Sequence, residues 1–163
     1  QLSMQVMGLR GVVEKTLADY RERAAGKEVR LVNQVPELEV WADPGRLEQA
    51  LGNLVDNAIK YGKTGGTVTV GAEPARETHL QVEVWVADDG PGIPAESLDR
   101  VFERFYRVDK ARSRDQGGTG LGLSIVKHII QSHGGRVWAT SEPDQGAVFR
   151  FTLPARQQRA DSV

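Results

Sequence analysis

Three polar side chains lie on one side of a segment whose pattern predicts a helix. Asn53, Asn57 and Lys60 occupy positions i, i+4 and i+7, so two carboxamides and an ammonium share one stripe. Mg²⁺ prefers oxygen ligands, usually one or two from the protein and the rest from phosphates and water. The stripe therefore suits a triphosphate with its magnesium. The alternative is a solvated helix face, although two asparagines in mid-helix are mildly unexpected.

A second candidate segment, Asp88-Asp89-Gly90-Pro91-Gly92-Ile93, comes where a predicted strand leaves its sheet. Gly90 and Gly92 allow the backbone to approach a ligand closely. Ile93 would add an apolar wall. The alternative is an ordinary acidic β-turn, because Asp-Gly and Pro-Gly are common turn pairs.

A glycine-rich segment, Gly118-Thr119-Gly120-Leu121-Gly122, opens a predicted helix. Free backbone N–H groups and the positive end of the helix dipole can face a phosphate there. The segment is not a dinucleotide fingerprint, which would require a glycine at Leu123 and a strand immediately before it. Gly62-Lys63-Thr64 resembles the end of a P-loop, but Asn57 stands where that motif needs its first glycine.

Between these segments lies a cluster of arginines and phenylalanines. Arg104 and Arg107 could reach phosphate oxygens, although surface arginines are the commoner explanation. Phe102 and Phe105 are expected to anchor this region in the core. Residues 108–118 lack an apolar period and are predicted to form a mobile loop.

Hydrophobic periodicity supplies the elements that must position these residues. Helices are predicted over 9–25, 44–61 and 121–132, with a short one around 97–105. Asp43 is the expected N-cap of the second helix, with Pro44 in its first position and Gly62 after its end. Strands are predicted over 28–32, 38–42, 67–73, 80–87, 136–141 and 147–153. On the fourth of these, Leu80, Val82, Val84 and Val86 should face one way.

These elements predict an α+β fold, a two-layer sandwich with about three helices on one side of a mostly antiparallel sheet. With 21 basic and 22 acidic residues among 163, the net charge is -1, which favours neither nucleic acid nor an anionic membrane as partner. The absence of cysteine excludes disulfides and thiolate metal sites. No apolar run in the sequence is long enough to span a bilayer.

In order and spacing, four segments resemble the N, G1, F and G2 boxes of the ATP-binding catalytic domain of sensor histidine kinases. That domain belongs to the wider gyrase, Hsp90, histidine kinase and MutL group of ATPases, whose fold is of the Bergerat type. The resemblance covers roughly residues 28–154. The segments are Asn53-Leu54-Val55-Asp56-Asn57-Ala58-Ile59-Lys60-Tyr61, Asp88-Asp89-Gly90-Pro91-Gly92-Ile93, Phe102-Glu103-Arg104-Phe105-Tyr106-Arg107 and Gly118-Thr119-Gly120-Leu121-Gly122-Leu123.

The resemblance implies ATP and Mg²⁺ as cofactors and assigns roles to individual residues. Asn57 would be the metal ligand, Asn53 and Lys60 would contact phosphates, and Tyr61 would flank the base. Asp88 would accept a hydrogen bond from the adenine 6-amino group, which favours adenine over guanine. The other implied nucleotide-binding positions are Gly90, Gly92, Ile93, Arg104, Arg107, Gly118, Thr119, Gly120, Leu121 and Gly122.

One position separates phosphoryl transfer from hydrolysis. Members of the group that hydrolyse ATP have a glutamate general base at the position matching Asn53. An amide cannot take up a proton at neutral pH, and Glu48 is expected to point away from this stripe. The resemblance therefore implies transfer of the γ-phosphoryl group to a positioned acceptor.

None of the three histidines has the sequence context of a phosphorylated histidine in this family. His79 precedes a strand, His128 should lie on a helix face, and His133 should lie at a helix C-terminus, where a cation suits the dipole. The first hypothesis is therefore a catalytic domain that phosphorylates a histidine on a separate dimerisation domain of the same homodimeric protein, which then passes the phosphoryl group to a response regulator. The second is an ATP-binding regulatory docking module, and a third, weaker one is a serine-directed kinase of this fold.

The expected organisation has three parts. Residues 1–27 would be a linker helix from an upstream dimerisation domain, residues 28–154 the catalytic domain, and residues 155–163 a polar tail. A chain that starts at Gln1 without a methionine suggests a cytoplasmic piece of a longer protein. Any membrane attachment would come from parts outside this sequence.

Overall fold

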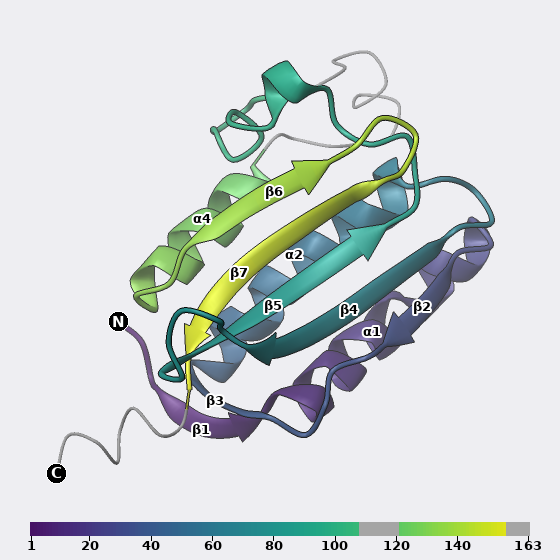
Figure 1. The fold of residues 1–163 in the computed structure, drawn as a ribbon. Helices are drawn as coiled ribbons and strands as arrows, with labels where there is room; N and C mark the ends of the chain where they lie inside the picture. Colours follow the sequence, from purple (N-terminus) through teal and green to yellow (C-terminus); the bar gives the residue numbers. More distant parts are fainter. Residues whose placement is uncertain (108–120, 156–163) are drawn as a thin grey trace, which may run out of the picture.

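A five-stranded mixed sheet forms one layer of the computed structural model, which describes residues 1–107 and 121–155 (Figure 1). Its strand order is β2-β4-β5-β7-β6. Only β2 and β4 are parallel, and the other neighbours are antiparallel. The strands are β2 (Arg30–Asn33), β4 (Thr67–Pro74), β5 (Gln81–Asp88), β6 (Val137–Ser141) and β7 (Ala147–Pro154). The mixed, mostly antiparallel sheet agrees with the prediction.

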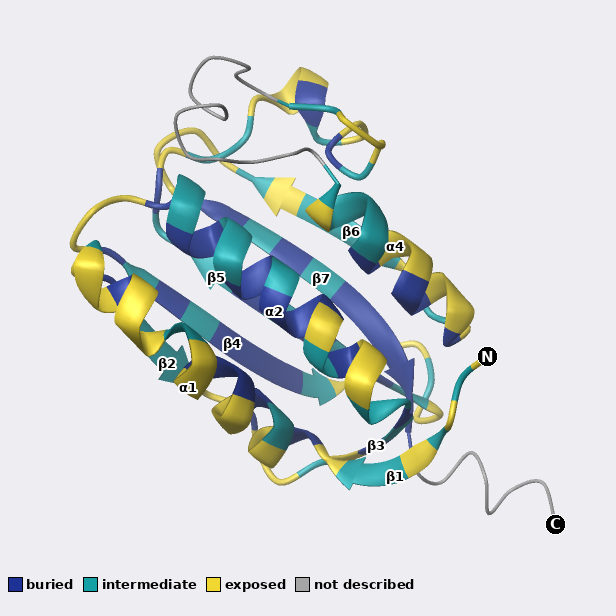
Figure 2. Ribbon diagram, turned by 180° about the vertical axis from the view of Figure 1, so that it is seen from behind, coloured by how far each residue is buried: buried dark blue, intermediate teal, exposed yellow. Residues whose placement is uncertain are grey.

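The second layer consists of helices α1 (Leu9–Gly26), α2 (Pro44–Tyr61) and α4 (Gly122–Ser132) on one face of the sheet. Figure 2 shows buried positions along the side of each helix that faces the sheet and exposed positions on the outer side. The core joins both layers, with Leu51 and Leu54 of α2 packed into the same cluster as Phe151 of β7. The predicted α+β sandwich is therefore confirmed.

Helix α2 begins and ends where local sequence signals place its ends. The Asp43 carboxylate accepts a hydrogen bond from the Arg46 N–H at 3.1 Å, which satisfies one of the unpaired donors of the first turn. Pro44 fills the first helical position, where no N–H is required. At the other end the Gly62 N–H closes the last turn on Ala58.

A two-stranded antiparallel sheet of β1 (Gln5–Gly8) and β3 (Glu39–Ala42) lies below the main sheet in Figure 1. The sequence predicted β3 but not β1. Four residues without a clear alternation contain no strand signal of their own, and the strand forms because β3 offers a pairing edge. Leu80 was expected to share one face of a strand with Val82, but it precedes β5 and is 39% exposed, whereas Val82 is 3% exposed.

The segment after β5 differs from the predicted short helix around residues 97–105. Regular helix is limited to the 3-10 turn η1 (Ala95–Ser97), which is followed by further i to i+3 turns. The Ser97 hydroxyl is 2.7 Å from the Tyr106 hydroxyl, which closes this segment on itself. A regular helix cannot continue through Phe105, whose φ of 65° lies in the left-handed region.

Helix α1 packs against α2 through one apolar side. Leu9, Val13 and Leu17 are at most 1% exposed and belong to the same core as α2. The assignment of residues 1–27 to a linker from a dimerisation domain stays a prediction. Residues 108–120 and 156–163, which include the predicted mobile loop and most of the predicted tail, lie outside the described residues. Within the described ranges, none of the helices combines the length and apolarity needed to cross a membrane.

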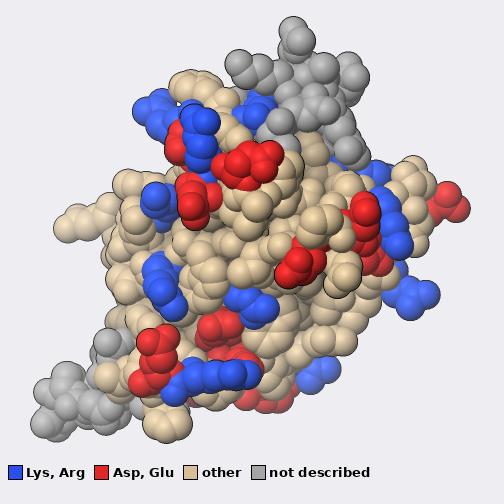
Figure 3. All heavy atoms as spheres, turned by 45° about the horizontal axis from the view of Figure 1, so that its top comes forward, with Lys and Arg blue, Asp and Glu red and all other residues tan. Residues whose placement is uncertain are grey.

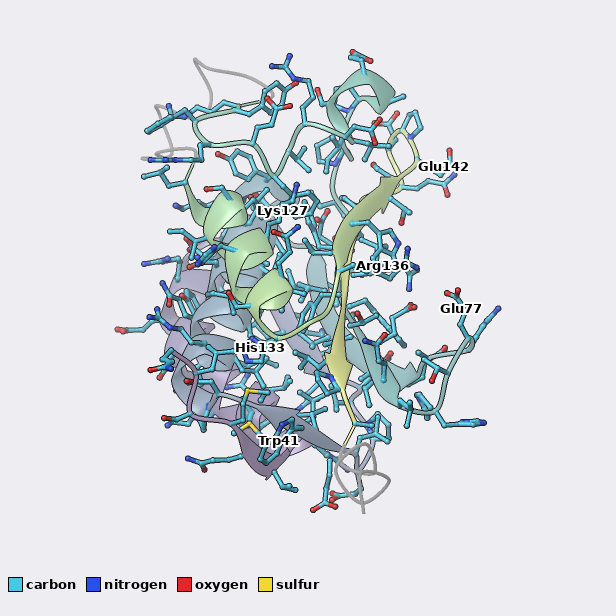
Figure 4. The ribbon with its side chains drawn as sticks, turned by 90° about the vertical axis from the view of Figure 1, so that its left-hand side faces the viewer. Trp41, Glu77, Lys127, His133, Arg136 and Glu142 are labelled. Carbon is cyan, nitrogen blue, oxygen red and sulfur yellow. The ribbon has the colours of Figure 1, made fainter. Side chains whose placement is uncertain are left out.

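His133 corrects one expectation about the end of α4. A cation was expected there, but His133 is only 5% exposed and lies between α4 and the start of α2 (Figure 4). Its Nε2 accepts a hydrogen bond from the Asp43 N–H at 3.1 Å, while Nδ1 is 2.8 Å from the Ile129 carbonyl oxygen. An acceptor Nε2 and a donor Nδ1–H define a neutral imidazole. Burial between two backbone partners therefore prevails over the helix dipole.

Replacing His133 by alanine should lower the free energy of unfolding by about 1–3 kcal/mol, because it leaves the half-buried Asp43 N–H without its acceptor. The matched control is His128→Ala on the exposed side of the same helix, which should change the stability by no more than about 0.5 kcal/mol. Urea unfolding of both variants measures the difference. Equal stability of the two variants would show that the bridge from His133 contributes nothing.

Candidate functional site

Several chain segments that are far apart in the sequence meet at one end of the sandwich. The C-terminus of α2, the end of β5 and the start of α4 lie near the turn between β6 and β7, at the upper end in Figure 1. Three of the four predicted motifs thus contribute residues to one region. The fourth, around residues 102–107, follows η1 beside the same end.

The polar stripe of α2 faces the start of α4. The Asn53 amide nitrogen donates a hydrogen bond to the Gly122 carbonyl oxygen at 3.2 Å, so the stripe is tied to the first residue of α4. Asn57 is half-buried one turn further along. The Lys60 ammonium is 3.2 Å from the Asp56 carboxylate, which also contacts Arg23. This ammonium therefore lies in a small charged cluster at the end of the stripe.

The backbone after α2 and the backbone after β5 are in close contact, without side chains between them. A Cβ at Gly90 would lie 2.7 Å from the Gly62 Cα and 3.1 Å from the Asp88 Oδ1. Real side chains do not tolerate the first of these distances, so glycine is required at position 90. Tyr61, the last residue of α2, is half-buried beside this contact.

The two neighbouring aspartates have different surroundings. Both carboxylate oxygens of Asp89 accept from the Thr67 N–H, at 3.0 and 3.2 Å, which holds the start of β4. Asp88 ends β5, and its Oδ1 accepts from the Gly90 N–H at 2.9 Å. Burial raises the pKa of Asp88, while the backbone N–H groups of Gly90 and Ala147 act in the opposite direction. Asp88 is therefore a partly desolvated carboxylate that favours a hydrogen-bond donor.

The β6–β7 hairpin braces the loop that follows Asp88. The Ser141 hydroxyl accepts from the Ile93 N–H at 2.8 Å and donates to the Gly146 carbonyl at 2.9 Å. The Asp144 N–H donates to the Pro91 carbonyl at 3.0 Å. Sequence reasoning assigned this hairpin only a structural role. A Gly at 146 was the only available signal, and turn glycines are too common to indicate contact with another loop.

The other two predicted residues of this loop are Gly92 and Ile93. Gly92 has a φ of 87°, a conformation that favours glycine, and a Cβ there would meet the Ser141 hydroxyl at 2.6 Å. Ile93 is half-buried and packs against the hydrophobic core. The loop therefore places the Gly90 backbone next to the Asp88 carboxylate and directs Ile93 to the core.

The segment around residues 102–107 is only partly as expected. Phe102 packs edge-on against Phe149 of β7, with ring centroids 5.8 Å apart, which confirms its role as a core anchor. The same prediction for Phe105 was wrong, because the left-handed turn directs its side chain outward and leaves it 62% exposed. The Arg104 guanidinium lies 5.5 Å from the Phe105 ring, and Arg107 is half-buried.

The glycine-rich motif is described only from its fourth residue. Gly118, Thr119 and Gly120 lie outside the described residues. Leu121 is the N-cap of α4, and Gly122 is the first, exposed residue of that helix. An exposed helix start next to Asn53 fits the predicted position of a phosphate, since the first backbone N–H groups of a helix have no partner within it.

Charges of both signs are interspersed on the face of the molecule shown in Figure 3, and neither sign forms a continuous area there. The net charge is -1. Long-range steering of an anionic ligand is therefore weak on this face, and affinity must come from local contacts.

Residues 42–157 match the family model described as "Histidine kinase-, DNA gyrase B-, and HSP90-like ATPase". The sensor histidine kinase WalK of Bacillus subtilis (strain 168) is 40% identical over 147 residues, which are 89% of this chain and 24% of WalK. The chain thus spans about a quarter of that relative.

Two solved structures extend the likeness to the fold. Full-length ShkA in complex with AMPPNP gives a TM-score of 0.81 at 32% identity, covering 95% of this chain and 32% of ShkA. Histidine kinase ThkA, solved in complex with the response regulator protein TrrA, gives 0.76 at 27% identity, covering 96% of this chain and 43% of the other.

The half-buried position of Asp88 predicts that its ionisation lowers the stability of the fold. A carboxyl with a raised pKa in the folded state favours folding in its protonated form, so this stabilisation is lost as the pH rises through the folded pKa. Asp88→Asn should therefore be more stable than the wild type at neutral pH, with the difference vanishing at acidic pH. Asp89→Asn, at the carboxylate that holds Thr67, should bring no such gain. Urea unfolding across this pH range measures both differences.

Proposed function

The chain belongs to the family of histidine kinase-, DNA gyrase B- and HSP90-like ATPases, in its sensor histidine kinase branch, and we propose that it presents Mg·ATP to a histidine on a separate dimerisation domain. The observation on which this rests most is the half-buried Asp88 carboxylate at the end of β5, surrounded by glycine backbone. Such a carboxylate suits an exocyclic amine on a flat base.

We place the adenine against Asp88, with Gly90, Gly92 and Ile93 beside it and Tyr61 at the end of α2. The phosphates would extend along the stripe of α2 towards the start of α4. Asn53 and Lys60 would contact them from α2, whereas Gly118, Thr119, Gly120, Leu121 and Gly122 would contact them through backbone N–H groups. Arg104 and Arg107 would approach from the segment after η1.

Magnesium fits this arrangement through Asn57. Among the described residues, no group of three or more His, Asp or Glu side chains is placed to hold a metal ion. A Mg²⁺ ion shared with phosphates needs only one or two protein oxygens, and the half-buried Asn57 can supply a neutral one. The ion would neutralise charge on the phosphate oxygens.

The proposed reaction is transfer of the γ-phosphoryl group. The bond between the γ-phosphorus and the bridging oxygen breaks, a histidine nitrogen forms the new bond to phosphorus, ADP leaves, and the imidazole loses its proton. Such transfer depends on positioning and charge stabilisation. Asn53 supports transfer over hydrolysis, because its amide cannot act as a base and donates its hydrogen bond to Gly122.

The partners follow from the same proposal. The histidine would be supplied by a dimerisation domain of the same protein in a homodimer. A response regulator would then receive the phosphoryl group, and a histidine kinase bound to a response regulator is known for ThkA and TrrA. We place this domain in the cytoplasm, where ATP is available.

The first test is nucleotide selectivity. The chain should bind ATP and ADP at least about tenfold more tightly than GTP and GDP, because guanine presents a carbonyl oxygen where Asp88 requires a donor. Asp88→Asn should weaken adenine nucleotide binding through loss of a charge-assisted hydrogen bond. Calorimetry measures both effects. Equal affinity for ATP and GTP would contradict the placement of adenine at Asp88.

A second test follows the phosphoryl group. The isolated chain should hydrolyse ATP very slowly and acquire no acid-labile phosphate, because Asn53 is not a base. Phosphotransfer should appear when a histidine-bearing dimerisation domain from a close relative is added, and labelled ATP detects it. Binding of ATP without transfer to any such domain would instead favour the regulatory docking module. Rapid hydrolysis would point to an ATPase with an unidentified base.

A further inference from the structure

The carbonyl groups at the C-terminus of α2 accept hydrogen bonds from a single side chain. The Lys27 ammonium donates to the carbonyl oxygens of Ile59, Lys60 and Gly62 at 2.8, 2.7 and 2.9 Å. The last four carbonyls of a helix have no partner within it, and a cation also suits the negative end of the helix dipole. An ammonium has three N–H donors, which matches the three carbonyls.

Lys27 is itself held in place by the end of the preceding helix. It is the C-cap of α1, and the following residue, Glu28, adopts a left-handed φ of 59° that turns the chain towards β2. The Lys27 carbonyl accepts from the Gly65 N–H at 3.0 Å. Both the backbone and the side chain of Lys27 therefore tie the end of α1 to the connection that follows α2.

The contact to Gly62 reaches the proposed adenine site. Gly62 lies against Asp88, since a Cβ on Gly62 would be 3.5 Å from the Asp88 Cβ, and it also lies against Gly90. Lys60 and Tyr61 were both assigned to the nucleotide. The Lys60 carbonyl is one of the three acceptors, and Tyr61 lies between Lys60 and Gly62 in the chain. The hydrogen bonds from Lys27 therefore restrain the last turn of α2 relative to the end of α1, and this turn is the part of the helix that meets Asp88 through Gly62.

We infer that Lys27 is a positioning residue for adenine nucleotide binding, which holds the last turn of α2 at the distance from Asp88 that the base requires. The inference rests on the proposed function. Lys27 lies outside residues 42–157, the part of the chain that matches the family model. It would not contact the nucleotide, and it acts through Gly62 and the backbone of α2.

The charge of Lys27 adds a second effect at the same site. Burial raises the pKa of Asp88, the neighbouring Asp89 raises it further, and the Lys27 ammonium lowers it, as do the N–H groups of Gly90 and Ala147. Lys27 therefore helps to keep Asp88 in the carboxylate form that accepts from the adenine amine. Loss of this cation should raise the pKa of Asp88.

The test compares Lys27→Met with the wild type in calorimetric titrations with ADP. The methionine keeps an apolar stem but offers no donor and no charge, so ADP affinity should fall on the order of tenfold. The acid-side loss of affinity should also move to higher pH. Titration of the ADP phosphates is common to both proteins and cancels in this comparison.

Lys63→Met is the matched control, because it removes one exposed cation from the α2–β4 connection, to which Lys27 is hydrogen-bonded through Gly62 and Gly65. It should leave both the affinity and the pH profile unchanged. Lys27→Gln provides a second variant if the methionine variant unfolds, since its amide can still donate to a carbonyl without a charge. It should be more stable than Lys27→Met while keeping the displaced pH profile.

The possible outcomes distinguish a failure of the inference about Lys27 from a failure of the proposed function. If Lys27→Met and Lys27→Gln unfold more easily but bind ADP like the wild type at every pH, Lys27 is only a structural cap and the inference is wrong. If the wild type itself does not bind ADP, the proposed function fails. Affinity loss in the Lys27 variants but not in Lys63→Met supports the inference.

Discussion

The burial of one side of α2 against the sheet is the constraint on which the candidate site depends. Leu47, Leu51, Leu54 and Ile59 are each at most 2% exposed. Burying a side chain of this size contributes roughly 1.5–3 kcal/mol, so any rotation of the helix that exposed several of them would be strongly disfavoured. The polar stripe lies on a neighbouring side of the same helix. Apolar contacts therefore fix where Asn53, Asn57 and Lys60 point, although these residues contribute little to the core.

The end of the sheet shows how backbone packing creates a recognition surface. Gly62 and Gly146 bring two other chain segments against Asp88, whose own loop contributes Gly90, and Gly146 lies so near the Asp88 carbonyl that no side chain could fit. This close approach removes water from the Asp88 carboxylate, which raises its pKa and costs stability. The same loss of water strengthens any hydrogen bond that the carboxylate accepts from a ligand. In the proposed function, the desolvation of Asp88 therefore lowers the stability of the fold but increases its selectivity for adenine.

The proposal that this domain holds ATP while another domain supplies the acceptor histidine also has a local physical basis. The amide of Asn53 is engaged with the start of α4 and cannot activate water. A nucleotide held here would keep its γ-phosphoryl group until an acceptor approached from outside. The chain spans 24% of WalK, so other parts of such a protein can provide that acceptor. A site that positions ATP without consuming it suits a signalling protein, because turnover then depends on domain contact.

The sequence by itself determined the elements whose signals are local. The limits of α2, the β6–β7 hairpin and the end of α4 shortly before Gly134 follow from caps, periodicity and turn residues within a few positions. Four motifs in order also identified the family. Only the tertiary structure decided the pairing of β1 with β3, the exposure of Phe105, the neutral bridge from His133 and the cap from Lys27. Apart from Phe105, whose exposure follows from its left-handed φ, each depends on partners brought together by folding, such as His133 with Asp43, 90 positions apart, and Lys27 with Gly62, 35 positions apart. Local preference contains no information about such partners, because the energy that selects them arises when the helices pack on the sheet.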